Sequence, residues 1–137
     1  MKKLINTSLF YAVLALAGGV FYREFTKSHG VSGGRLAFVH LHLFVLGMLM
    51  FLLLALFQDR LKLIEARSFR PAYWIYNAGV LVMTAGLVWR GVCDTLSLTL
   101  SRGVNAAISG LSGIGHILLA AGLVLLLLIL RKRAGKR

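Results

Sequence analysis

The chain contains little acid, cysteine or proline, and these shortages exclude several classes of function. A single cysteine, Cys93, leaves no partner for an intramolecular disulfide and no basis for a cysteine-based metal site. Only four of the 137 residues are Asp or Glu. The sequence contains no carboxylate pair, phosphate-binding loop or nucleophile with a neighbouring base. These absences argue against a hydrolase or a transferase, and they leave open whether the protein is an enzyme.

Basic and apolar residues, by contrast, are abundant. Sixteen Lys and Arg residues give a net charge of +12, 58% of the residues are hydrophobic, and the mean hydropathy is +0.82. This composition is too apolar for a soluble domain, so we expect the chain to fold in a lipid bilayer. The basic residues lie between the apolar runs, where they serve as membrane anchors, and we therefore expect no nucleic-acid partner.

Four apolar runs account for most of the chain. At about 1.5 Å per helical residue, each is long enough to cross a hydrocarbon core of roughly 30 Å. A spanning segment must satisfy its own backbone hydrogen bonds, and short connections make neighbouring helices antiparallel. The sequence therefore predicts an all-α fold, an antiparallel four-transmembrane-helix bundle that forms one membrane domain over residues 1–137. The expected spans are Leu4–Tyr22, Leu36–Phe57, Ala72–Trp89 and Ala106–Leu130.

The distribution of basic residues predicts the orientation. With four spans, both termini and the second connection share one side, which carries 11 Lys and Arg residues against five on the other side. The positive-inside rule then places both termini in the cytoplasm, and we expect a bacterial inner membrane protein. Lys2, Lys3 and the small residues near Ala17 resemble a signal peptide, whose cleavage would leave three spans. The apolar run continues to Tyr22, which favours a retained first span.

Three histidines within the spans are the candidate ligands. Ionisable side chains at membrane depth are costly and rare, so His40, His42 and His116 each suggest a functional site. The alternative is that they are neutral and only help the helices to pack. Measured from the cytoplasmic ends of their spans, His116, His42 and His40 lie about 21, 22 and 26 Å deep at helical rise. This common level favours a group that bridges the second and fourth spans.

The choice between His40 and His42 as the partner of His116 stays open. Their spacing separates them by about 200° around a helix, so both cannot bind one metal from a regular helix. His40 shares its face with the small residue Gly47, which favours close approach of another helix, whereas depth slightly favours His42. On the fourth span, His116 belongs to a stripe of small and polar residues that includes Gly113.

Haem b is the cofactor that suits these ligands. Two or three histidines without carboxylate or thiolate partners suit calcium, magnesium or structural zinc poorly, whereas haem iron needs only one or two imidazoles. Gly47 and Gly113 would give the porphyrin plane room against the backbone. Arg35 would meet the propionates near the non-cytoplasmic surface, with Arg23, Arg90 and Arg102 close to the same interface. The predicted metal ligands are His40, His42 and His116.

One helix of the chain resembles a known one. His40-Leu41-His42, followed by Leu46-Gly47, looks like the His-x-His helix of the catalytic subunits of haem–copper oxidases and nitric oxide reductases. The whole chain, including the Gly-x-Gly-His motif that ends at His116, is similar to an uncharacterised family of small four-helix bacterial membrane proteins. The resemblance implies haem b binding by the three histidines. The further copper-ligand histidines and the proton-channel acids of an oxidase are missing, so oxygen reduction is not expected.

The expected function is that of a b-type haem membrane protein, used for electron transfer, gas binding or redox sensing. A redox partner would accompany such a role. If the histidine not paired with His116 is also a ligand, it would face a second haem or a neighbouring subunit, which suggests a homo-oligomer. Two rival hypotheses are a transporter or channel subunit with a proton or metal relay, and a structural partner of a larger membrane complex.

Overall fold

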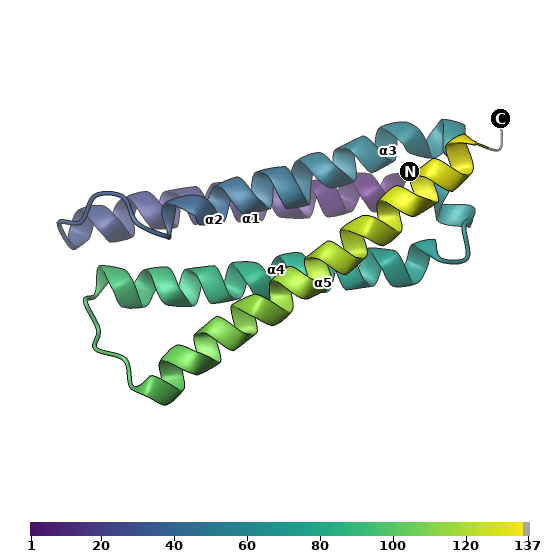
Figure 1. Cartoon of the computed structure of the whole chain (residues 1–137). Helices are drawn as coiled ribbons and strands as arrows, with labels where there is room; N and C mark the ends of the chain where they lie inside the picture. The colour runs from purple at the N-terminus through teal and green to yellow at the C-terminus, as the bar shows by residue number, and fades with distance from the viewer. Residues whose placement is uncertain (136–137) are drawn as a thin grey trace.

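The computed structural model describes residues 1–135 and confirms an all-helical fold, with no strand in that range. Four helices are long and apolar enough to cross a membrane (Figure 1), and each runs antiparallel to the one before it in the chain. The second span, Ala37–Leu61, is continuous but has a π-helical middle. The elements are α1 (Lys2–Ser28), α2 (Ala37–His42), π-helix η1 (Leu43–Leu49), α3 (Met50–Leu61), 3₁₀-helix η2 (Leu63–Glu65), α4 (Phe69–Thr95) and α5 (Arg102–Ala134).

Except at the start of the second span, where α2 begins at Ala37, the spanning helices extend beyond the apolar runs, because a helix keeps its backbone bonds where its side chains become polar. The last turn of α5 contains Arg131 and Arg133, whose positive charges suit the negative end of the helix dipole. At the other end of α5, the hydroxyl of Ser101 accepts a hydrogen bond from the Val104 amide at 3.3 Å. The start of α1 and the last turn of α5 lie at the same end of the bundle as the connection between α3 and α4 (Figure 1), as four antiparallel spans require.

Glycines bring α4 and α5 into backbone contact. A methyl group placed on Gly115 would lie 2.5 Å from the Met83 amide nitrogen, and one placed on Gly122 would lie 2.6 Å from the Tyr76 Cα. Neither helix backbone can give way locally, so only glycine fits at these positions. Without a hydrophobic driving force between helices in lipid, such close packing is what holds them together. Gly115 and Gly122 are seven residues apart, so they lie on one face of α5.

The second span packs against α1 and α4 through aromatic rings and polar side chains. Tyr11 of α1 stacks on Phe51 with ring centroids 5.8 Å apart, and its hydroxyl donates to the buried Asn77 Oδ1 at 2.8 Å. Two further hydroxyls bond backbone carbonyls of η1, with Ser8 donating to Met48 at 2.9 Å and Tyr76 to Leu46 at 2.8 Å. Both bonds are made to carbonyl groups of the π-helical segment, so its backbone is contacted by polar side chains of α1 and α4.

The fourth span leaves the others at one end of the bundle. Near its C-terminal end α5 contacts α3 and η2, and along most of its length it packs on α4. Toward its N-terminus it diverges from α2, so the ribbons of α2 and α5 are far apart at the end that holds the first and third connections (Figure 1). The candidate site lies in this region, between α2, α4 and α5.

Candidate cofactor site

A pocket with a volume of about 560 Å³ lies between α2, α4 and α5. Its size falls within the range that cofactor and ligand sites occupy. Two of the three histidines in the spans, His42 of α2 and His116 of α5, line it from different helices. The remaining lining residues are mostly small, apolar or basic. They are Arg35, Met83, Gly86, Leu87, Arg90, Ser109 and Ser112.

Helical periodicity explains why these residues meet. On α4, Met83, Gly86 and Arg90 follow one another by three and four residues, so they form one stripe along the helix. Ser112 and His116 of α5 have the same spacing of four. The two stripes meet where a side chain on Gly86 would collide with the Ser112 hydroxyl. The close contact at Gly115 fixes the rotation of α5 and so places its neighbour His116 at the edge of the α4–α5 interface.

Both pocket histidines have one ring nitrogen tied to the backbone. His42 Nδ1 lies 2.7 Å from the carbonyl oxygen of Phe38, and His116 Nδ1 lies 2.7 Å from that of Ser112. A carbonyl oxygen can only accept, so in each neutral ring the proton is on Nδ1 and Nε2 keeps its lone pair. Metal-binding histidines are held in this tautomer in the same way. The arrangement therefore leaves the lone pair of each Nε2 atom available as a hydrogen-bond acceptor or a metal ligand.

The third histidine does not reach this pocket. The Cβ of His40 lies 3.8 Å from the position of a methyl group on Gly19, and its ring stacks on Tyr22 with centroids 6.3 Å apart. His40 thus packs against α1. Its Nδ1 is buried without a hydrogen-bond partner among residues 1–135. The small-residue face of the second span favoured His40 as the partner of His116, but in the structure α1 covers that face.

The two glycines that were expected to make room for a porphyrin lie outside the pocket. Gly47 packs so closely against the Tyr11 ring that no side chain would fit, so it serves the contact with α1. Gly113 is exposed, and a methyl group on it would meet nothing within 4 Å. The glycine that lines the pocket is Gly86 of α4.

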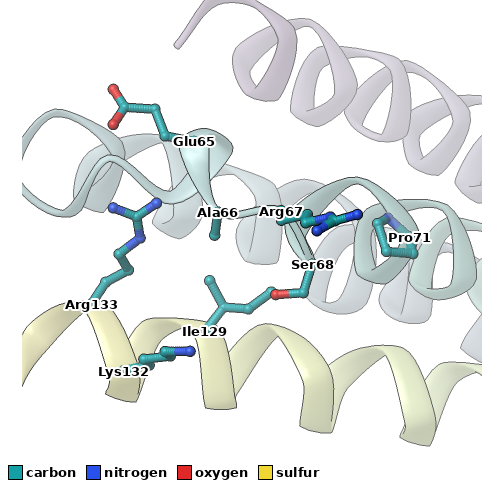
Figure 2. A pocket seen from close by; sticks show the side chains of 8 residues that line it. All are labelled: Glu65, Ala66, Arg67, Ser68, Pro71, Ile129, Lys132 and Arg133. Carbon is teal, nitrogen blue, oxygen red and sulfur yellow. The ribbon is translucent and has the colours of Figure 1, made fainter.

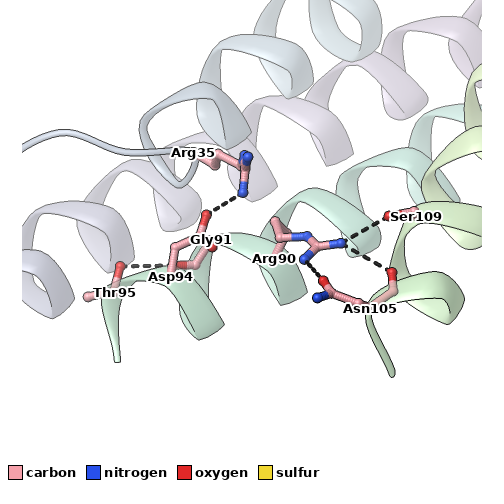
Figure 3. Close-up of polar contacts among 7 residues, drawn as sticks. All are labelled: Arg35, Arg90, Gly91, Asp94, Thr95, Asn105 and Ser109. Carbon is pink, nitrogen blue, oxygen red and sulfur yellow. Dashed lines mark hydrogen bonds and ion pairs between the residues drawn. The ribbon is translucent and has the colours of Figure 1, made fainter. Parts of the chain in front are cut away.

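Two arginines line the pocket and are held by neighbouring side chains (Figure 3). Arg35 forms an ion pair with Asp94, with Nη1 and Oδ2 2.6 Å apart and both side chains partly exposed. Arg90 donates to the Asn105 side chain and, at 3.0 Å, to the Ser109 hydroxyl, so it links α4 to the first turns of α5. Both arginines lie near helix ends, so the pocket is basic at the end of the bundle that holds the first and third connections.

The three histidines do not form one metal cluster. Among residues 1–135, no group of three His, Cys, Asp or Glu side chains is close enough to hold a metal ion. The arrangement that exists is a pair, His42 and His116, in one pocket. The fourth histidine, His29, lies exposed at the end of α1, with its Nδ1 2.8 Å from the Phe25 carbonyl oxygen and 3.1 Å from the Ser28 hydroxyl.

Sequence reasoning did not assign the α4 side of the pocket to the site. Arg90 was expected only close to the interface that the propionates would reach, and Met83, Gly86 and Leu87 were not expected in the site. A signal was present, because Met83, Leu87 and Arg90 are spaced by four and three residues and so share a helix face. That face could be recognised as a pocket wall only once the divergence of α5 was known.

Comparison with known families gives one match. The model of the family DUF2871, described as a protein of unknown function, matches residues 1–133. No curated protein and no solved structure matches the chain. The expected membership of an uncharacterised family is thus confirmed, whereas no relation to the haem–copper oxidases is shown.

Proposed function

The chain belongs to the DUF2871 family, and we propose that it is a membrane protein that binds haem b between α2, α4 and α5. In this proposal His42 and His116 would hold the haem iron. One observation carries the proposal: these two histidines line one pocket from different helices. In each ring Nδ1 donates to a backbone carbonyl, so the lone pair of Nε2 is free to bind iron.

Haem fits this donor set better than a bare metal ion does. A zinc or calcium site needs more ligands than two imidazoles, whereas a porphyrin supplies four nitrogens of its own. Met83, Gly86 and Leu87 give the pocket an apolar floor for the ring. Arg35 and Arg90 line the same pocket, and their guanidinium groups would pair with the two propionates. Arg90 is held there by Asn105 and Ser109.

The two proposed histidine ligands bear on whether the haem would serve electron transfer or gas binding. When bound, the haem would supply one-electron redox chemistry at a potential set by its ligands and its surroundings. If His42 and His116 both held the iron, a gas would have to displace one of them. The proposed use is therefore electron transfer, which requires a redox partner, in preference to gas binding.

Orientation and assembly are part of the proposal. The excess of basic residues at the end with both termini supports a cytoplasmic location for that end in a bacterial inner membrane. The haem pocket would then lie toward the opposite surface. His40 contacts α1 of its own chain, so it gives no reason to expect a ligand from a second subunit, and a homo-oligomer needs support from elsewhere.

The test is to produce the protein with haem supplied, purify it in detergent, and record the visible spectrum and the haem-to-protein ratio. We expect a Soret band and about one haem per chain. His42→Ala and His116→Ala should each shift the band and lower the haem content. His40→Ala is the matched control, because it removes an imidazole from the same span but from a face that packs on α1.

Two results would overturn the proposal. One is a wild-type protein that takes up no haem when it is folded and haem is in excess. The other is a spectrum that depends on His40 and not on His42. Flux of protons or metal ions into liposomes without a chromophore would instead favour the relay hypothesis, and alanine tolerance at all three histidines would favour a structural role.

A further inference from the structure

A second pocket lies at the opposite end of the bundle, where the connection between α3 and α4 faces the last turns of α5. It has a volume of about 560 Å³ and shares no residue with the haem pocket. Three of its lining residues are cations, and one is an acid (Figure 2). The full lining comprises Glu65, Ala66, Arg67, Ser68, Pro71, Ile129, Lys132 and Arg133.

The cations come from two directions. Lys132 and Arg133 project from neighbouring positions on α5, and Arg67 lies on the facing segment just before α4 (Figure 2). None of the three has a hydrogen bond or an ion pair with another side chain of residues 1–135. Glu65 is the only acid in the lining, so the pocket keeps a net charge of +2. Cations grouped in this way repel one another unless an anion lies between them.

The other lining residues suit a phosphate ester. The Ser68 hydroxyl has no hydrogen-bond partner among residues 1–135, so its O–H is available to donate. Ile129, which is 7% exposed, and Pro71 give the pocket an apolar wall. The pocket lies at the end of two membrane-spanning helices, at the level where lipid headgroups meet water. A basic pocket between helix ends at this level is typical of anionic headgroup sites.

We propose that this pocket binds the phosphate of a phosphate ester, with the headgroup of an anionic phospholipid as the source that its position favours. Arg67, Lys132 and Arg133 bind the phosphate oxygens, Ser68 donates to one of them, and the apolar wall contacts the glycerol and the first part of an acyl chain. The proposal does not depend on haem binding, because none of these residues lines the other pocket.

The test uses the full chain in detergent micelles and native mass spectrometry to count bound lipid. The probes are phosphatidylglycerol, phosphatidylcholine and inorganic phosphate, each titrated separately. The triple variant Arg67→Gln, Lys132→Gln, Arg133→Gln should weaken phosphatidylglycerol binding by about tenfold or more. The matched control is Lys2→Gln, Arg70→Gln, Arg131→Gln, which removes the same charge from the same end at positions outside the pocket. It should change binding by less than about twofold.

Each outcome distinguishes a pocket from a merely charged surface. Preference for phosphatidylglycerol over phosphatidylcholine, lost only in the pocket variant, supports a lipid site. Saturable binding of inorganic phosphate with the same dependence supports the phosphate site and assigns it to a soluble ester. Equal losses in the two triple variants, or no binding of either anion by the wild type, would overturn the proposal. Circular dichroism of both variants shows that each is folded.

Discussion

Replacing Gly115 by alanine should destabilise the bundle, because this residue is where α5 touches the backbone of α4. The added methyl group would lie 2.5 Å from the Met83 nitrogen, whereas ordinary contact begins at 3.4 Å. The helices must therefore move apart by about 0.9 Å at this point. Over-packing of this kind costs about 1–3 kcal/mol. The favourable helix propensity of alanine, about 1 kcal/mol relative to glycine in a soluble helix, offsets only part of it.

The control lies one half-turn away on the same helix. A methyl group on Gly113 would meet nothing within 4 Å, so Gly113→Ala should leave the stability unchanged or raise it slightly. The free energy of unfolding is measured by titrating SDS into detergent micelles and following far-ultraviolet circular dichroism. Equal losses in Gly113→Ala and Gly115→Ala, or no loss in either, would refute the close contact. Because His116 follows Gly115, the displaced helix should also lower haem occupancy in Gly115→Ala.

Three further predictions concern polar contacts and orientation. Asp94→Asn breaks the ion pair with Arg35, and because the two side chains are 43% and 57% exposed, the free energy of unfolding should fall by less than about 1 kcal/mol in the same SDS titration. A larger loss would mean that the pair is shielded from water. Tyr11→Phe leaves the buried Asn77 Oδ1 without its donor and should cost about 0.6 kcal/mol and no more than about 1.7 kcal/mol, the mean and the maximum for interhelical hydrogen bonds in a membrane protein; an equal cost in the control Tyr22→Phe would contradict this. A green fluorescent protein fused to the C-terminus should fluoresce and an alkaline phosphatase fused there should be inactive, and the reverse pattern would place the termini outside the cytoplasm.

Sequence alone predicted the four spans and their antiparallel order, because length and apolarity suffice for that. The helices are longer than the expected spans: the first span was expected over residues 4–22, and α1 extends from Lys2 to Ser28. Apolarity marks where the hydrocarbon ends, but backbone hydrogen bonding continues through polar residues. The π-helical segment Leu43–Leu49 was not predicted, and two of its carbonyls accept hydrogen bonds from Ser8 and Tyr76, which lie on other helices.

The candidate site shows where helical periodicity stops being informative. The 200° separation of His40 and His42 was enough to predict that they face different neighbours, and they do. Which neighbour covers which face was not predictable, because this depends on the order of helices around the bundle and on the divergence of α5. The small-residue criterion was misleading for the same reason. Gly47 does permit close approach, but the group that approaches is the Tyr11 ring of α1.

The central claim is that His42 and His116 bind one iron from two helices, and electron paramagnetic resonance of the oxidised, haem-loaded protein tests it most directly. We expect a low-spin signal from the wild type and a high-spin signal from His42→Gly and from His116→Gly. Added imidazole should enter the space left by either side chain and restore the low-spin signal. A low-spin signal that persists in His42→Gly and disappears in His40→Gly would contradict the claim.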